Sequence, residues 1–121
     1  MVSKIALEEH FLSPGLEEYW WPTVQGVDPK HAKNLLAQLT DFAEMRLGAM
    51  DEAGIARSVL AIAGPGVQAE RDAATATHRA RESNDFLARE VQKRPDRYSA
   101  FGHIALQDPA ASPRATSPTF L

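Results

Sequence analysis

Cysteine is absent from this chain of 121 residues, which excludes disulfides, thiolate metal sites and a cysteine nucleophile. No apolar stretch approaches the ~20 residues that a membrane-spanning helix needs. The net charge is only −3, so the charge balance does not indicate a nucleic acid or an anionic membrane as partner. Acidic residues appear by position 8, which is unlike a signal peptide. We therefore expect a cytoplasmic protein.

The composition predicts a soluble globular protein with one modest domain. Apolar residues make up 44% of the chain and charged residues 24%, which is ordinary for such proteins. A chain of this length has room for a single small core.

Hydrophobic patterning predicts alternating strands and helices. Near-continuous apolar runs at residues 4–7, 58–63 and 98–106 are typical of buried strands. Apolar residues recur at three- and four-residue steps over about 31–53 and 69–93, which predicts two helices. The order strand, helix, strand, helix, strand indicates an α/β fold with a parallel sheet, either doubly wound or a barrel.

The end of the first strand carries the best candidate for a site. Glu8 and His10 are two residues apart, so their side chains leave a regular strand on the same face, while Glu9 points the other way. A carboxylate beside an imidazole suits Zn²⁺ or Mn²⁺, although a usable site needs three or four ligands. The alternative is a strand end with exposed charges and no metal.

Two further segments follow strands or lie in a long loop. Gly64-Pro65-Gly66-Val67 comes directly after the second strand, where glycines let the backbone approach a ligand closely or simply form a tight turn into the helix. Trp20 and Trp21 lie in the loop over 13–29 and either line a pocket for a planar substrate or attach the loop to the body. We interpret the single His103 in the third strand as a structural or surface residue.

Six segments in order carry a resemblance to a known family. The chain resembles the amino-terminal third of the amidohydrolase-related decarboxylases of the γ-resorcylate (2,6-dihydroxybenzoate) and 2,3-dihydroxybenzoate type. The segments are Ala6-Leu7-Glu8-Glu9-His10-Phe11, Arg46 to Ile55, Gly64 to Gln68, Ser83-Asn84-Asp85, Arg94 to Tyr98 and Leu106-Gln107-Asp108-Pro109.

This resemblance implies a (β/α)₈ TIM barrel, of which the chain would form the opening strand–helix–strand–helix–strand portion. It implies non-oxidative decarboxylation of a hydroxybenzoate with a divalent metal, Zn or Mn, and relatives that are homo-oligomers. Glu8 and His10 would be metal ligands, because the family's first strand supplies Glu-x-His where its hydrolase branches begin with His-x-His. The residues implied to contact the aromatic acid are Phe11, Trp20, Trp21, Gly64, Pro65, Gly66 and Val67.

The chain also departs from the family pattern. Residues 110–121 are rich in Ser, Thr and Pro where the family continues into another helix, so we expect a partial barrel domain over 1–109 followed by a disordered tail. The histidine of a middle strand and the aspartate of a late strand are missing, so we expect a truncated enzyme that carries none of its catalytic residues and is inactive alone. The alternatives are a non-catalytic remnant or interaction module, and a metal-dependent hydrolase of the same superfamily.

Overall fold

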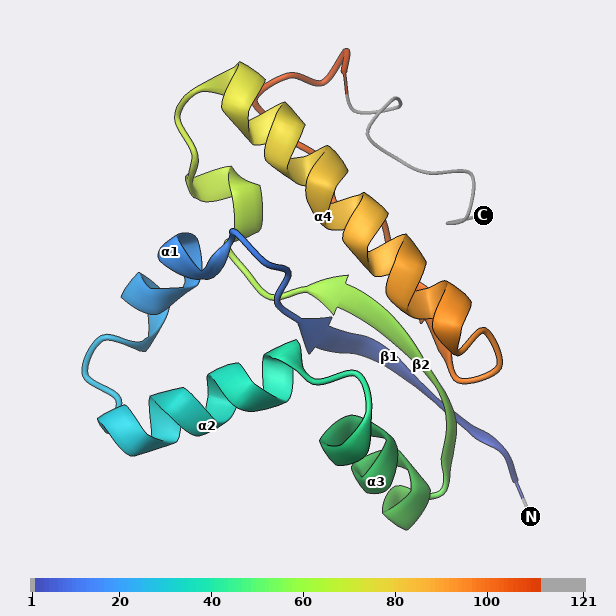
Figure 1. Cartoon of the computed structure of the whole chain (residues 1–121). Coiled ribbons are helices and arrows are strands. Elements are labelled where there is room, and N and C mark those ends of the chain that lie inside the picture. The colour runs from blue at the N-terminus through green and yellow to red at the C-terminus, as the bar shows by residue number, and fades with distance from the viewer. Residues whose placement is uncertain (1, 112–121) are drawn as a thin grey trace.

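A three-stranded parallel sheet forms the centre of the chain. The computed structural model describes residues 2–111, in which β1 (Lys4–Phe11), β2 (Ile55–Ile62) and β3 (Tyr98–Ala100) pair in the order β1-β2-β3 (Figure 1). Both pairings are parallel, so the carboxyl ends of all three strands lie at one edge of the sheet. The predicted α/β fold class is confirmed.

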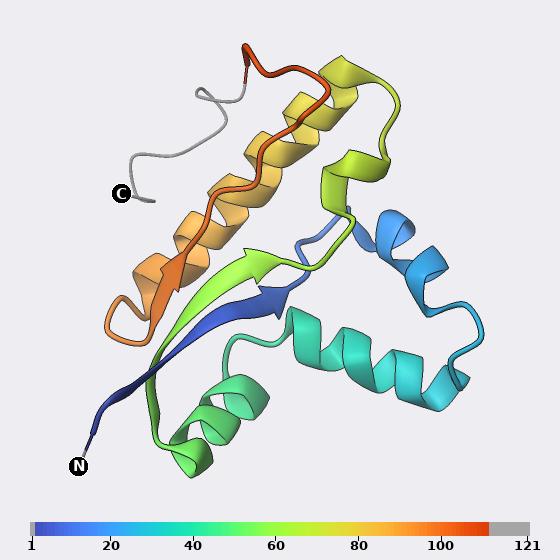
Figure 2. The same ribbon diagram turned by 180° about the vertical axis from the view of Figure 1, so that it is seen from behind.

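Helices connect the strands and cover one face of the sheet (Figures 1 and 2). The first crossover contains several helices and the second is dominated by one long helix. They are α1 (Glu17–Trp20), the 3₁₀ turn η1 (Trp21–Val24), α2 (Pro29–Thr40), α3 (Glu44–Ala53), the 3₁₀ turn η2 (Gly66–Ala69) and α4 (Ala73–Lys93). Among residues 2–111, no helix combines the length and the hydrophobicity needed to cross a bilayer.

Two apolar clusters hold the helices on the sheet. Beneath α3 and α4, Leu60 of β2 packs with Phe11, Met50, Leu87 and Tyr98. The second cluster lies at the carboxyl edge, where the loops after β1 and β2 meet α1 and the start of α4. Its buried residues are Leu12, Leu16, Trp20, Ala63, Val67, Ala76, Ala80 and Ala105. The carboxyl edge of the sheet is therefore a packed part of the molecule.

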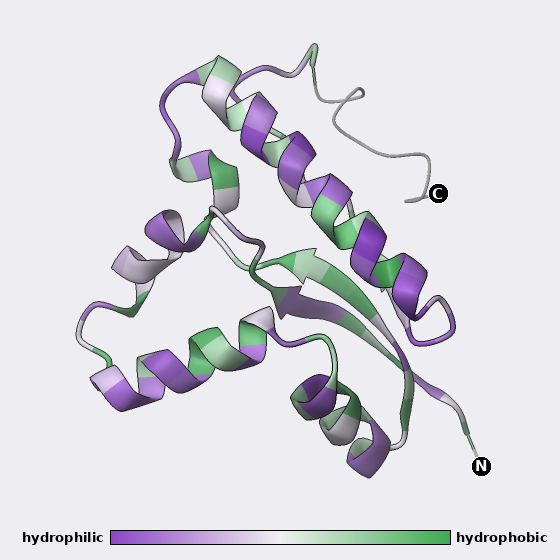
Figure 3. Cartoon of the chain, in the orientation of Figure 1, coloured by the Kyte–Doolittle hydropathy of each residue, from purple (hydrophilic) through white to green (hydrophobic). Residues whose placement is uncertain are grey.

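The opposite face of the sheet lacks such cover in the described residues. Ile5 and Leu7 of β1 expose 60% and 65% of their surface, and Phe101, directly after β3, exposes 55%. We call this the open face. Figure 3 also shows that β1 becomes hydrophilic toward its carboxyl end, whereas β2 stays largely hydrophobic. Apolar side chains of this kind normally fill the interior of a barrel.

Several predicted boundaries differ from the structure. Strand β2 begins earlier than expected, at Ile55, and α4 begins later, at Ala73. The single helix expected over 31–53 is divided, because α2 ends at Thr40 and the Asp41 carboxylate accepts the backbone N–H of Arg46 at 2.8 Å. The third strand was expected to reach residue 106 but ends at Ala100. The first strand is longer than expected and reaches Phe11. Of the predicted tail, residues 112–121 lie outside the described residues.

Candidate functional site

Strand β1 is irregular at the predicted metal ligands. Ala6 pairs with Ser58 and Glu9 pairs with Leu60, so β1 advances three residues while β2 advances two. The extra residue makes a bulge, and Glu8 has a positive φ of 60°. The strict alternation used in the sequence prediction therefore does not hold at Glu8, although the Glu8 and His10 side chains are both exposed.

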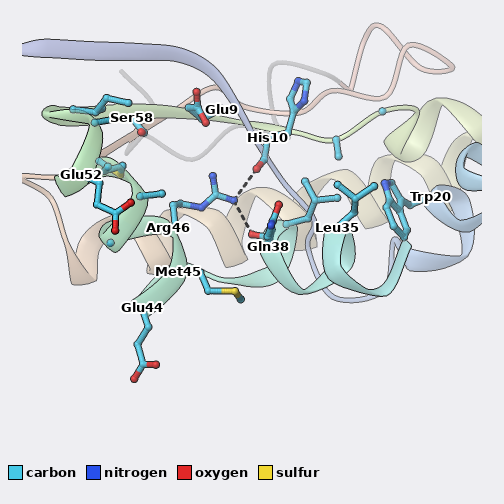
Figure 4. Close-up of a pocket in the computed structure, with 18 of the residues that line it drawn as sticks. Glu9, His10, Trp20, Leu35, Gln38, Glu44, Met45, Arg46, Glu52 and Ser58 are labelled. Carbon is cyan, nitrogen blue, oxygen red and sulfur yellow. Dashed lines mark hydrogen bonds between the residues drawn. The ribbon is translucent and has the colours of Figure 1, made fainter. Parts of the chain in front are cut away.

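Beyond the bulge the alternation resumes. Glu9 pairs with Leu60, whose side chain is buried under the helices, and His10 pairs with Ala61 on the opposite face. Figure 4 agrees, because the His10 imidazole points away from Arg46 and Gln38 of the helix layer. His10 is thus at the carboxyl end of β1 on the open face, where the first strand of a barrel would present a ligand.

An arginine holds the backbone at His10. Arg46 Nη2 donates to the His10 carbonyl at 2.7 Å and to the Gln38 carbonyl at 3.3 Å, and its Nε donates to the Asp41 carbonyl at 2.9 Å (Figure 4). Burial lowers the pKa of the Arg46 guanidinium. One side chain therefore binds the end of β1, the end of α2 and the turn before α3 together.

A hollow of about 1070 Å³ lies on the helix side of this arginine. Glu9, the backbone of His10, Leu35, Gln38 and Arg46 are among its lining (Figure 4). Because the His10 imidazole points out of this hollow, the hollow is distinct from the predicted metal site. It lies along β1, whose outer edge has no partner strand in the described residues, at a place where a closed barrel would carry another helix.

The loop after β2 begins exposed, becomes buried at Gly66 and Val67, and is bound there by hydrogen bonds. Gly64 is exposed, whereas Gly66 and Val67 are buried. The Val67 N–H donates to His103 Nε2 at 3.0 Å, and Gln107 Nε2 donates to the Val67 carbonyl at 2.7 Å. Gly64 and Pro65 are therefore the parts of this loop left open to a ligand, and Gly66 and Val67 support them.

The predicted aromatic contacts are divided between core and surface. Phe11 is only 1% exposed, and its ring lies 5.8 Å from that of Phe42 in the core. Trp20 is buried and packs edge-on against Trp21 at 5.0 Å, while Trp21 remains 40% exposed. Trp20 thus attaches the long loop to the body, and Trp21 is the member of this set with a free surface.

A polar network fixes the neighbouring turn α1. The Tyr19 hydroxyl donates to the Glu70 carboxylate, and Arg79 lies over the Tyr19 ring at 5.0 Å while pairing with Glu18. Desolvation, together with the hydrogen bond to Glu70, raises the pKa of Tyr19 to about 12. The aromatic segment is therefore anchored to α4 by both apolar and polar contacts.

The donor atoms at the end of β1 fit a divalent metal in kind but form only part of a site. A carboxylate and an imidazole are ligands that Mn²⁺ and Zn²⁺ accept. Within residues 2–111, however, no group of three or more His, Cys, Asp or Glu side chains is placed to hold a metal ion. Glu8 and His10 would need further ligands from outside these residues.

Sequence reasoning missed the parts played by Arg46 and Asn84, and it did not identify the contacts of His103. Asn84 Nδ2 donates to the His103 carbonyl at 2.8 Å and its Oδ1 accepts the His103 N–H at 2.7 Å. Asn84 lies on the buried face of α4, which is mostly small residues. A buried amide must find partners, so its position on that face was the available signal.

Comparison with known proteins gives a consistent relationship. No family model matches the chain. The γ-resorcylate decarboxylase of Polaromonas sp. (strain JS666) is 40% identical over 114 residues, which cover 94% of this chain and 34% of that protein. The chain thus spans about a third of the length of the curated relatives that it matches.

Solved structures agree in fold. A 2,6-dihydroxybenzoate decarboxylase complexed with 2,6-dihydroxybenzoate superposes with a TM-score of 0.85 and 41% identity, covering 95% of this chain and 35% of that chain. The dihydroxybenzoic acid decarboxylase of Polaromonas sp. JS666, with bound manganese and the inhibitor 2-nitroresorcinol, gives 0.84 and 39%, covering 94% and 33%. The predicted opening portion of a TIM barrel is confirmed. Nearly the whole chain is thus homologous to about one third of the amidohydrolase-related γ-resorcylate decarboxylases.

Proposed function

We propose that this chain supplies the first-strand part of the metal site of a non-oxidative hydroxybenzoate decarboxylase. The observation that supports this most is the position of His10, on the open face at the carboxyl end of β1, next to the bulged and exposed Glu8. Manganese in a solved relative agrees with the proposed donor set. A bound divalent ion would orient the substrate's carboxylate and stabilise developing negative charge.

The remaining tasks of the described residues concern binding and orientation. Gly64 and Pro65 would form a wall of the substrate site, backed by the buried Gly66 and Val67. Trp21, with its free surface, is the aromatic residue best suited to contact a ring from this segment. The inward-facing apolar side chains of the open face would exclude water behind the site. None of these residues is proposed as the proton donor.

The sharpest test uses a chimera. Residues 2–111 would replace the homologous third of the Polaromonas enzyme, and manganese content and turnover of 2,6-dihydroxybenzoate would be measured for Glu8→Gln, His10→Asn and the control Glu9→Gln. We expect the first two to lose metal and at least ~10²-fold in rate. The control should keep both, because Glu9 is on the helix side. Equal metal content in all three variants would refute the ligand assignment.

A second candidate function is association without catalysis. It is favoured by the exposed apolar side chains of the open face and by the outer edges of β1 and β3, which have no partner strand in the described residues. Such edges and faces promote pairing with other chains. We expect the 121-residue chain alone to release no carbon dioxide from hydroxybenzoates with Mn²⁺ or Zn²⁺ added. A chain that elutes as a monomer in size-exclusion chromatography and also releases carbon dioxide would contradict both the expected inactivity and the expected association.

A further inference from the structure

One of the contacts between the segment after β3 and the loop after β2 is made by a histidine, beside those of Gln68 and Gln107. His103 Nε2 accepts the backbone N–H of Val67 at 3.0 Å. The ring also lies so close to Gly66 that a Cβ added there would be 2.6 Å from Nε2. The imidazole thus packs directly on the backbone of Gly66 and Val67. A residue larger than glycine at position 66 would collide with the ring.

The position of this ring is in turn set by helix α4. Asn84 is 1% exposed and makes two hydrogen bonds to the backbone of His103, one to its carbonyl and one from its N–H. A paired contact of this kind fixes the place and the direction of the His103 backbone. A chain of hydrogen bonds therefore joins Asn84 on α4 to His103, and His103 to Val67 in the loop.

The contact requires one protonation state of the ring. Nε2 can accept the Val67 N–H only while it carries no proton, so the proton of the neutral imidazole is on Nδ1. The side chains that bond the surrounding backbone are the neutral amides of Asn84 on α4, Gln68 on η2 and Gln107. Burial lowers the pKa of His103, and within residues 2–111 no charged side chain contributes to that shift.

We propose that His103 is a positioning residue: in its neutral form it holds the Gly64–Val67 loop as a fixed wall of the site for the aromatic acid. Its link to the substrate rests on the function proposed above. The link between His103 and the loop stands on its own, because it follows from the hydrogen bonds of the described residues. Protonation of His103 turns Nε2 into a donor facing a donor, so this contact with Val67 is lost while those of Gln68 and Gln107 remain.

The test of the loop contact needs neither metal nor substrate. Amide exchange and chemical shifts of Val67 would be followed by NMR on the 121-residue chain between pH 8 and pH 5. The variants are His103→Phe, which fills the space but accepts no hydrogen bond, His103→Gln, whose amide oxygen accepts one without titrating, and the control His78→Gln on the exposed side of α4.

We expect exchange at Val67 about tenfold faster in His103→Phe and restored in His103→Gln. In the wild-type chain the Val67 shift should follow the titration of the His103 ring, and in His103→Gln it should be independent of pH. The control should behave as wild type. An unprotected Val67 amide at pH 8 in the wild-type chain, or a Val67 titration that persists in His103→Gln, would overturn the proposal even if one variant failed to fold.

The chimera separates this proposal from the proposed function. His103→Phe should raise KM for 2,6-dihydroxybenzoate while manganese content stays unchanged, and His103→Gln should restore KM. Loss of manganese in Glu8→Gln with an unchanged KM in His103→Phe would leave the metal assignment intact and reject the wall. A protected and pH-sensitive Val67 amide, together with a chimera that binds no manganese, would support the loop contact and reject the metal assignment.

Discussion

The end of β1 and the loop after β2 leave the sheet at the same edge but are stabilised differently. At the end of β1, the side chains of Glu8 and His10 are exposed. Arg46 contacts the backbone carbonyl of His10 and leaves its imidazole unbound. After β2, Gly66 and Val67 are buried and bonded by His103 and Gln107. The difference separates exposed groups of the kind that bind metals from a loop whose shape is set by contacts within the chain.

The largest effect should come from adding one methyl group to the loop. Gly66→Ala places a Cβ 2.6 Å from His103 Nε2 at a φ of +58°, so strain and overpacking add, and we expect a loss of about 3 kcal/mol in unfolding free energy. Gly64→Ala is the matched control, since its Cβ would meet nothing within 4 Å. Denaturant unfolding of both variants measures the difference, and similar midpoints would show that the loop is not rigid.

A smaller effect is expected on the β1 side. Arg46→Ala removes charge-assisted hydrogen bonds to three carbonyls, and we expect a loss of about 2 kcal/mol. Arg46→Lys should recover only part, because an ammonium group lacks the planar fork of the guanidinium. Arg81→Ala, on the exposed side of α4, serves as control. If thermal unfolding gave the same stability for Arg46→Ala and Arg81→Ala, the three-way contact would not matter in solution.

The effect of pH on the free energy of unfolding should be smaller again, and it should arise from His103, which contacts the loop after β2. The folded pKa of His103 is below its ordinary value of about 6.5, so the unfolded chain takes up the proton first. This contribution to stability is complete above about pH 6.5 and is lost as the pH falls from there through the folded pKa. Unfolding midpoints measured between pH 7.5 and 5 should fall in wild type and less in His103→Gln. Identical slopes would assign the loss to other groups.

The smallest effect on stability is expected on the open face near β1. Leu7→Ser changes a side chain that is 65% exposed, and we expect the free energy of unfolding to change by no more than ~0.5 kcal/mol. The same substitution should reduce association of the chain, because it removes part of an exposed apolar surface. Light scattering measures association and denaturant unfolding measures stability. A large loss of stability would mean that Leu7 is covered in solution.

Hydrophobic periodicity was sufficient to predict the order of strands and helices, because each element buries a regular face. It could not divide α2 from α3, since the apolar spacing continues through Phe42 while the break depends on Asp41 binding Arg46. The third strand was overextended because an apolar run does not reveal whether a partner strand is present. These errors concern boundaries, where local pattern and tertiary contact disagree.

The candidate site was predictable in chemical type but not in detail. Glu8 and His10 stand out because charged residues end an apolar run. The bulge at Glu8 depends on register against β2, and the contact of Asn84 with His103 joins residues 19 apart. Such pairings depend on the folded chain, and a single sequence offers no local signal for them beyond an amide on a helix face that is expected to be buried.

The backbone at Glu8 suggests what a selection experiment would recover. With a φ of +60°, position 8 suits glycine or asparagine better than glutamate, by about 1 kcal/mol. A library randomised at this codon and sorted only for proteolytic resistance should therefore drift toward Gly and Asn. The same library sorted for manganese-dependent turnover in the chimera should return to Glu. The backbone strain at this residue would then be a measurable conflict between folding and catalysis.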